Sequence, residues 1–309
     1  MEILLTGGTG LIGSRLVPEL IKRGHSVTEL RRYSASRGLV SDETHRIVWY
    51  DMRGGSDLRG VVKPDIVLHL AAMASNEVAN QNPVECFDII ATGTQRLISD
   101  VDRIDAMPFF VLASSSEVIG NGIGGVFAHN PYAAAKIAAE EAVRASGFQW
   151  VVARPFNTYG RALIGAPVAV IDKMIVAALR GEPLERWQTT AVRDFLWRED
   201  HVDAYLALVE TLEGRPDSVL SRAIQFGTGH GVQVNDVIPV IAKQLGAEVV
   251  DVPYGRPNDT PHLVAETAVA ERLLGWTAKV SLEDGIDLAI EEWKVTLRTR
   301  PMRLLSATS

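Results

Sequence analysis

Ile3-Leu4-Leu5-Thr6-Gly7-Gly8-Thr9-Gly10-Leu11-Ile12-Gly13 is the stretch that decides the fold of this 309-residue chain. It opens with a short apolar run typical of a buried strand and continues into a glycine-rich turn. The residues after it, up to Arg23, carry apolar side chains at helical spacing. A strand, a tight turn and a helix in this order aim backbone N–H groups at a pyrophosphate. The segment therefore predicts a dinucleotide site at Gly7, Gly10, Leu11, Ile12 and Gly13; a plain strand–turn–helix is the alternative.

Strand-like and helix-like runs alternate over the first 160 residues. The expected strands after the first are 26–30, 47–50, 65–70, 109–113 and 149–153, and an alanine-rich helix is expected over 133–145. This alternation is typical of crossover units, so it predicts an α/β fold with a Rossmann-type, doubly wound parallel sheet.

The pattern loosens after residue 160, which suggests two domains. We expect residues 1–162, with a return segment at about 192–227, to form an NAD(P)-binding Rossmann domain. Residues 163–191 and 228–309 would form a smaller, mostly helical substrate domain. The last residues, 298–309, lack apolar periodicity and are expected to form a mobile tail.

Composition excludes several classes of protein. The net charge of −7 argues against a nucleic-acid-binding surface, and no apolar run is long enough for a membrane span. One cysteine cannot form an intrachain disulfide, and the seven histidines show no zinc-ligand spacing, so no metal is expected. These features predict a soluble, cytoplasmic enzyme.

The end of the second strand should select the cofactor. An acidic residue there binds the adenosine ribose hydroxyl of NAD, whereas arginine suits the 2′-phosphate of NADP. Here Glu29-Leu30-Arg31-Arg32-Tyr33-Ser34 places two arginines at that point, so NADP is favoured over NAD. The alternative is that both arginines are merely solvated and Glu29 or another group contacts the ribose. After the third strand, Asp51 and Met52 are candidates to contact adenine.

A second informative segment carries candidate catalytic groups. Tyr132 and Lys136 are four residues apart in Pro131-Tyr132-Ala133-Ala134-Ala135-Lys136, so on a helix they share a face. An ammonium beside a phenol lowers the phenol pKa, which would make Tyr132 a better base. Upstream, the run Ser114–Ser116 follows a strand and would present hydroxyls at the carboxyl end of the sheet.

These motifs together resemble the extended short-chain dehydrogenase/reductase family, the NAD(P)-dependent nucleotide-sugar epimerases and dehydratases. The similarity covers about residues 1–295 and includes segments 7–13, 68–72, 82–83, 93–94, 114–120, 131–136, 154–160, 193–195, 199–200, 226–229 and 256–257. It implies a transient oxidation of a sugar carbon, commonly C4.

The resemblance also implies roles for individual residues. Ser115 and Tyr132 would act on the substrate hydroxyl, and Lys136 would bind the nicotinamide ribose. Glu117 matches the base of the sugar dehydratases, although a structural carboxylate is equally open. The remaining expected cofactor contacts are Leu70, Ala71, Ala72 and Pro155, and the expected substrate contacts are Ser115, Ser116, Asn157, Arg193 and Arg256. For each of these two arginines the alternative is an interdomain ion pair.

Three departures from the family pattern affect the predicted sugar pocket. Ile119 replaces the usual tyrosine, and Ile90 replaces the usual asparagine before Gly93 and Thr94. Fewer positions than usual separate Ser115 from Tyr132. The leading interpretation is a nucleotide-sugar epimerase or dehydratase, and the alternative is an NADPH-dependent nucleotide 4-keto-sugar reductase. A cofactor-binding scaffold without turnover is the third interpretation. The resemblance further suggests a homodimer formed through 82–101 and 132–143.

Overall fold

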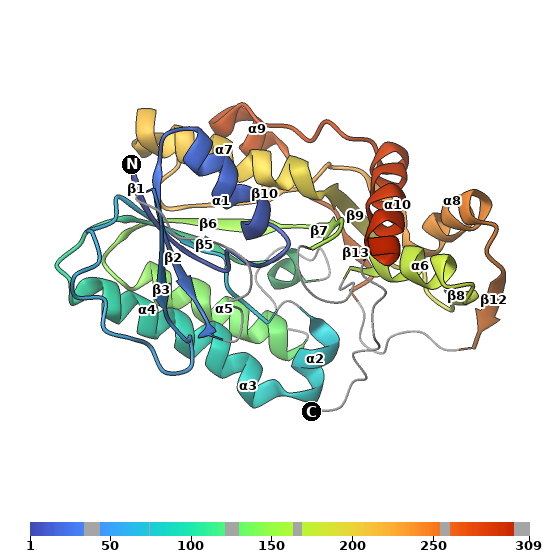
Figure 1. The fold of residues 1–309 in the computed structure, drawn as a ribbon, viewed down its shortest axis with the longest axis horizontal. Coiled ribbons are helices and arrows are strands. Elements are labelled where there is room, and N and C mark those ends of the chain that lie inside the picture. The colour runs from blue at the N-terminus through green and yellow to red at the C-terminus, as the bar shows by residue number, and fades with distance from the viewer. Residues whose placement is uncertain (34–43, 74, 121–129, 163–168, 254–259, 300–309) are drawn as a thin grey trace.

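A parallel sheet of seven strands forms the centre of the chain (Figure 1). The computed structural model describes residues 1–33, 44–73, 75–120, 130–162, 169–253 and 260–299. The strand order is β10-β6-β5-β4-β1-β2-β3. The strands are β1 (Glu2–Thr6), β2 (Ser26–Arg31), β3 (His45–Trp49), β4 (Ile66–His69), β5 (Phe109–Ala113), β6 (Gln149–Pro155) and β10 (Arg222–Phe226). The predicted Rossmann-type α/β fold is therefore confirmed.

Helices cover both faces of this sheet (Figure 1). On one face lie α1 (Gly13–Lys22), α7 (Arg198–Gly214) and α9 (Ala268–Leu274). On the other lie α2 (Asn76–Gln81), α3 (Pro83–Phe87), α4 (Gly93–Asp102) and α5 (Pro131–Arg144). A π-helical turn at Asp88–Thr92 joins α3 to α4. Because apolar side chains project from both faces of β1, β4 and β5, neither face can be left to water.

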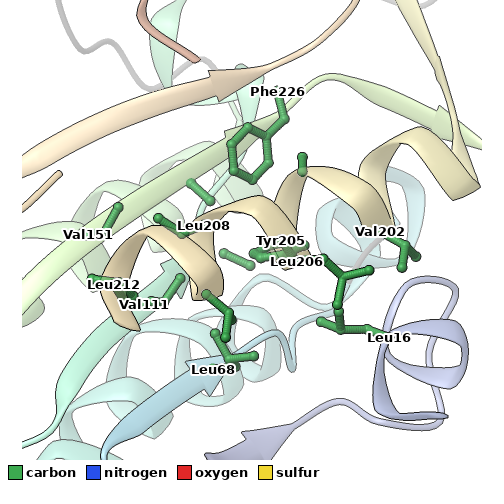
Figure 2. Packing of buried hydrophobic residues seen from close by; sticks show 14 of the residues in the cluster. Leu16, Leu68, Val111, Val151, Val202, Tyr205, Leu206, Leu208, Leu212 and Phe226 are labelled. Atoms are coloured by element: carbon green, nitrogen blue, oxygen red, sulfur yellow. The ribbon is translucent and has the colours of Figure 1, made fainter. Parts of the chain in front are cut away.

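The larger core fills the space between the sheet and α7. Leu68, Val111 and Val151 point from the sheet toward Tyr205 and Leu208 of α7 (Figure 2). Each of these five side chains is at most 1% exposed. This packing fixes the position of the sheet relative to α7, and therefore the position of the strand ends that carry the predicted site.

The remaining elements form a second unit beside the sheet. Its helices are α6 (Val170–Leu179), α8 (Val234–Leu245) and α10 (Leu282–Thr299). Its strands are β7 (Asn157–Tyr159), β8 (Leu184–Trp187), β9 (Val192–Trp197), β11 (Gly231–Gln233), β12 (Val249–Val252) and β13 (His262–Leu263). β9 is the centre of one small sheet, with β7, β11 and β13, and β8 pairs with β12 in another. The sequence pattern missed these strands because most are two to four residues long, too short for a period-two pattern to show.

We propose two domains with boundaries that differ from the expected ones: α7, β10 and α9 belong with the large sheet, whereas β9 belongs to the second unit. The segment expected as a mobile tail falls mostly on residues 300–309, which lie outside the described part of the chain. In the described residues, no helix combines the length and the apolar character needed to cross a membrane. The same residues contain no cluster of acidic, histidine and cysteine side chains suited to a metal ion.

A buried arginine joins the second unit to the first. Arg198, at the start of α7, is fully buried, and its guanidinium donates to Glu292 of α10 at 2.7 Å and 3.2 Å. It also bonds Glu199 and the carbonyl of Arg161. Glu292 in turn lies 3.6 Å from Arg15 of α1. A buried charge is tolerated only when it is paired, so these bonds fix α10 against the start of α1 and α7.

Two buried histidines should make the fold sensitive to mild acid. Burial lowers the pKa of His69 and of His201 to about 3, whereas a histidine in an unfolded chain titrates near ~6.5. Below that pH the unfolded chain binds protons that the native chain does not. Stability therefore falls as pH decreases toward 3, by about 1.4 kcal/mol per pH unit for each histidine.

The variant His201→Leu should remove one of these two contributions. Urea unfolding of the variant between about pH 6 and about pH 5 should show a pH dependence shallower by up to about 1.4 kcal/mol per unit than that of the wild type. His230→Gln, which alters an exposed histidine, is the control and should behave as the wild type. An unchanged slope in His201→Leu would contradict the prediction.

Candidate functional site

The glycine turn after β1 is shaped to hold a diphosphate. Gly7 has a φ of +80°, and a Cβ there would lie 2.8 Å from the backbone nitrogen of Ala71. A Cβ on Gly13 would overlap the carbonyl oxygen of Gly7. The turn closes with a hydrogen bond of 3.0 Å from Gly10 N to Gly7 O, directly before α1. Backbone N–H groups at a helix N-terminus favour an anion, so the residues present fit the diphosphate of a nicotinamide dinucleotide. Leu70 and Ala72 adjoin Ala71 at the end of β4.

The expectation that both arginines at the end of β2 face the cofactor is corrected by the structure. Arg31 is only 3% exposed and forms a two-pronged ion pair with Glu29, with Nε donating to Oε1 at 2.9 Å and Nη2 to Oε2. His45 Nε2 lies 3.2 Å from the same carboxylate. Arg31 is therefore held by a buried partner, and Arg32 is the exposed arginine at this strand end. Glu29 is buried as well, and its contact with the ribose stays a prediction.

Asp51 and Met52 lie directly after β3, where the adenine contact was expected. Asp51 accepts from Arg53 Nε at 3.1 Å and Nη2 at 2.9 Å, and these bonds lower the pKa of its carboxyl to about 2. Met52 is buried, and a Cβ on Gly93 would lie 2.9 Å from Met52 Cβ. Asp51 is thus a fixed carboxylate and Met52 is part of the packing under α4. Their contact with adenine stays a prediction.

Ser115, Tyr132 and Lys136 come together at the carboxyl end of β5. The Ser115 hydroxyl lies close enough to the Tyr132 phenol to lower its pKa, and the Lys136 ammonium lies 5.9 Å from the Tyr132 ring centroid. Lys136 Nζ donates to the carbonyl oxygen of Ala113 at 2.5 Å. Asn130 begins α5 by accepting from Ala133 N at 2.7 Å, which sets the turn that carries Tyr132. The three groups lie together as predicted, and their catalytic roles stay predictions.

The expected lowering of the Tyr132 pKa by Lys136 is not found. Burial raises the pKa of the Tyr132 phenol, the hydrogen bond from Ser115 opposes this, and Glu117 raises the pKa further. Burial also lowers the pKa of Lys136 to about 8, so its ammonium stays mostly protonated near neutral pH. Lys136 therefore keeps a positive charge beside the phenol, and an oxidised nicotinamide would add another, together with a hydride acceptor, when it is bound.

Sequence reasoning missed the buried carboxylate that supports Lys136. Glu140 is one turn further along α5, is fully buried, and its charge raises the pKa of Lys136 against the effect of burial. It accepts from Ser114 Oγ at 2.5 Å and from two nitrogens of Arg154 at 2.9 Å and 2.7 Å. The only sequence signal was its spacing of four residues from Lys136. Glu140 thus ties α5 to β5 and β6 directly behind the site.

The Glu117 carboxylate is held by two amides from distant segments. Asn76 Nδ2, at the start of α2, donates to Oε1 at 3.2 Å, and Asn130 Nδ2 donates to Oε2 at 3.4 Å. Because Asn130 also caps α5, one side chain sets the position of both Glu117 and Tyr132. Because both carboxylate oxygens are bonded, the catalytic and the structural alternatives for Glu117 both stay open.

The predicted substrate contacts differ in how the structure places them. The Asn157 Nδ2 atom is buried and finds no hydrogen-bond partner among the described residues, as expected of a group reserved for a ligand. Arg193 is buried in β9 and donates to the Val192 carbonyl at 2.8 Å. Ser116 is buried at the start of the turn after β5, and Pro155 ends β6. Arg256 lies outside the described residues. Contact of each with a ligand stays a prediction.

The residue beside Arg193 has a structural role that the motif alone did not reveal. Asp194 is fully buried and accepts from Thr228 N at 2.9 Å, Gly229 N at 2.8 Å and Ala265 N at 3.2 Å. These bonds fasten β9 to the turn after β10 and to the chain after β13. Asp194 therefore positions Arg193 rather than facing a ligand itself.

The two residues that depart from the family pattern, Ile119 and Ile90, have apolar surroundings. Ile119 packs with Phe156, Leu263 and Ala265, and Ile90 is buried in the π-helical turn, where its carbonyl accepts from Thr94 at 2.6 Å. The loop expected to be shortened falls mainly on residues 121–129, which are not among the described ones.

The comparison with known proteins decides the family. The sequence matches the NAD dependent epimerase/dehydratase family over residues 3–220. The chain belongs to this family. It is 27% identical to a UDP-glucose 4-epimerase from Cyamopsis tetragonoloba, over 94% of this chain and 93% of that one. It is thus an enzyme of the epimerase/dehydratase class.

Solved structures of other members of the family have the same fold. MoeE5, solved in complex with UDP-glucuronic acid and NAD, is 28% identical and superposes with a TM-score of 0.84 over 96% of this chain and 100% of that one. TunA, an NAD-dependent NDP-hexosamine 5,6-dehydratase involved in tunicamycin biosynthesis, is 27% identical with a TM-score of 0.83 over 95% and 98%. Members of the family at this similarity therefore include both epimerases and dehydratases.

The closed turn between Gly7 and Gly13 gives a test of the dinucleotide site. In Gly13→Ala the new methyl group would overlap Gly7 O and lie 2.6 Å from Gly8 Cα, so the turn must open. We expect NAD binding, measured by isothermal titration calorimetry, to weaken more than about ten-fold.

Gly54→Ala is the matched control, because a Cβ there would meet no atom of the described residues within 4 Å. It should bind NAD like the wild type. Equal affinity in Gly13→Ala and Gly54→Ala would show that the turn does not hold the dinucleotide.

Proposed function

We propose that the chain transiently oxidises a ring carbon of a nucleotide-diphosphate sugar, commonly C4, and then completes an epimerisation or a dehydration on the 4-keto sugar. The observation that carries this proposal is the meeting of three groups at the carboxyl end of β5: the Lys136 ammonium lies 5.9 Å from the Tyr132 ring centroid, and Ser115 is buried beside the same phenol. Tyr132 would take the proton of the sugar hydroxyl, and Ser115 would bind the same oxygen. Lys136 would hold the nicotinamide ribose and add positive charge beside the phenolate.

The position of Glu117 supports a proton transfer after the oxidation. A ketone acidifies the hydrogen on the adjacent carbon, and a carboxylate held beside the site can accept it. Glu117 is fixed by Asn76 and Asn130 and acts electrostatically on Tyr132. In a dehydration the carbon–hydrogen bond breaks with its proton going to Glu117. The electron pair of the broken bond then forms the double bond, as hydroxide leaves the neighbouring carbon and takes the proton from Glu117 to form water. Return of the hydride from the reduced cofactor to the unsaturated sugar makes the net change the loss of one water. We therefore place dehydration ahead of simple epimerisation.

The nucleotide diphosphate requires positive charge against a net charge of −7. Arg193 and Arg256 are our candidates for this role, and Asn157 is our candidate for a polar contact with the sugar or its diphosphate. The guanidinium groups of the two arginines suit a diphosphate, and Asp194 fixes the strand that carries Arg193. The buried Nδ2 atom of Asn157 has no hydrogen-bond partner among the described residues.

We propose further that the protein is a cytoplasmic homodimer. Its one cysteine, Cys86, is free and buried, which fits a reducing compartment. Val84 and Phe87 of α3, in the segment expected to form the interface, are 82% and 44% exposed. Apolar side chains exposed together are typical of a covered surface.

The reaction is tested by a panel of UDP-, GDP- and dTDP-sugars incubated with the protein and NAD and analysed by mass spectrometry. We expect loss of one water from at least one substrate, or an unchanged mass with altered retention if the reaction is an epimerisation. Tyr132→Phe should abolish either product, because it removes the acid/base group with little change in packing.

A gain of two hydrogens with added NADPH would instead show a reductase. No change with any member of the panel, or full turnover by Tyr132→Phe, would contradict the proposal. Glu117→Gln separates the two favoured reactions, since it should stop the loss of water and leave the initial oxidation intact.

A further inference from the structure

Two neighbouring residues at the start of α2 contact two different parts of the protein. Asn76 Nδ2 donates to Glu117 Oε1 at 3.2 Å, in the turn that follows β5. Lys173 Nζ of α6, which belongs to the second unit, donates to Glu77 Oε2 at 3.3 Å. The first turn of α2 therefore contacts the candidate base on one side and the second unit on the other.

The α2 helix depends on its side-chain contacts for its position. It has only six residues, and Ser75 Oγ caps it by accepting from Val78 N at 3.3 Å. Ala79 is fully buried in the same cluster as Ala135 of α5. So short a helix has few internal hydrogen bonds, and the contacts of Asn76 therefore set where its first turn lies.

Lys173 is carried by a helix whose position is fixed. The residue before it, Asp172, is 2% exposed and accepts from Trp293 Nε1 of α10 at 2.7 Å and from Gly160 N at 3.0 Å. These bonds hold α6 against α10 and against the end of β7. The position of the Lys173 ammonium therefore follows that of the second unit.

The two contacts of α2 differ in strength. The ion pair is exposed, with 42% of the Lys173 side chain and 64% of the Glu77 side chain open to solvent, and exposed pairs contribute little to stability. The bond from Asn76 to a carboxylate is charge-assisted and stronger. A general base must lie within hydrogen-bond reach of its proton, and a displacement of about 1 Å can slow a reaction by about 100-fold. A small shift of α2 is therefore enough to affect Glu117.

We infer that α2 couples the second unit to the proton transfer, with Asn76 and Glu77 as positioning residues for Glu117. Lys173 holds Glu77 and so sets the first turn of α2. Asn76 in that turn orients the Glu117 carboxylate. The inference rests on the proposed function, in which Glu117 accepts a proton from the 4-keto sugar.

Reversal of the charges tests the coupling. Lys173→Glu places two carboxylates side by side, and the double variant Lys173→Glu with Glu77→Lys restores an ion pair. The NAD-loaded proteins are mixed rapidly with a nucleotide sugar that the wild type converts. In Lys173→Glu the absorbance of reduced nicotinamide should decay at least about three-fold more slowly. Its rise should be unchanged, because the rise depends on Tyr132 and the decay on Glu117. The double variant should decay like the wild type.

Lys63→Glu is the matched control. It reverses an exposed ion pair in which Lys63 Nζ lies 3.0 Å from Asp105 Oδ2, in the segments before β4 and β5 and thus at the opposite edge of the sheet. Both phases should match those of the wild type. An unchanged decay in Lys173→Glu would overturn the inference, as would a slower rise together with the slower decay. Failure of the double variant to restore the decay would do the same.

Hydrogen–deuterium exchange of residues 114–120 tests the coupling without turnover. This segment carries Glu117, whose backbone N–H donates to Ser115 Oγ at 3.2 Å. Its exchange should be faster in Lys173→Glu and return to the wild-type rate in the double variant, and equal exchange in all three proteins would overturn the coupling. If the wild type converts no nucleotide sugar, the proposed function fails, and the exchange measurement still decides whether α6 controls this turn.

Discussion

Parallel strands impose the arrangement from which everything else in this protein follows. Because all seven strands of the large sheet run in one direction, their carboxyl ends meet at a single edge. The glycine turn follows β1, Arg32 follows β2, Asp51 follows β3, Ala71 follows β4 and Ser115 follows β5. The site is therefore a property of the topology, and local sequence decides only which chemical group each strand delivers to that edge.

Buried ion pairs fix the elements around that edge. Glu140 with Arg154 fixes α5 behind Lys136, and Glu29 with Arg31 fixes the end of β2 beneath the glycine turn. Arg198 with Glu292 joins the smaller unit to the helices of the larger one. Each pair is satisfied within the protein, and loss of one partner would leave the other charge uncompensated in a poorly solvated place. Among the described residues, the groups that remain for ligands include the buried Nδ2 atom of Asn157 and the Ser115–Tyr132 pair.

The sequence was sufficient to predict the large sheet, the glycine turn and the proximity of Ser115, Tyr132 and Lys136. Each of these features depends on local periodicity or on which residue follows a strand. It was insufficient for contacts between distant segments. Nothing in the spacing shows that Asn76 and Asn130 hold Glu117, or that burial raises the pKa of Tyr132. Arg31 was misjudged for the same reason. Glu29, two residues away on the same strand, has its side chain on the same face of the sheet and forms an ion pair with Arg31. Because Arg31 is paired with Glu29, it no longer supports the interpretation as an NADPH-dependent reductase.

We propose that catalysis begins with hydride transfer from a sugar carbon when Tyr132 removes a hydroxyl proton. It is tested most directly by rapid mixing of the NAD-loaded wild-type protein with a nucleotide sugar that it converts, while the absorbance of reduced nicotinamide is followed. We predict that this absorbance rises within the first turnover and falls again as product forms. Product formation without any rise, under conditions in which the reduced cofactor would be seen, would contradict the account.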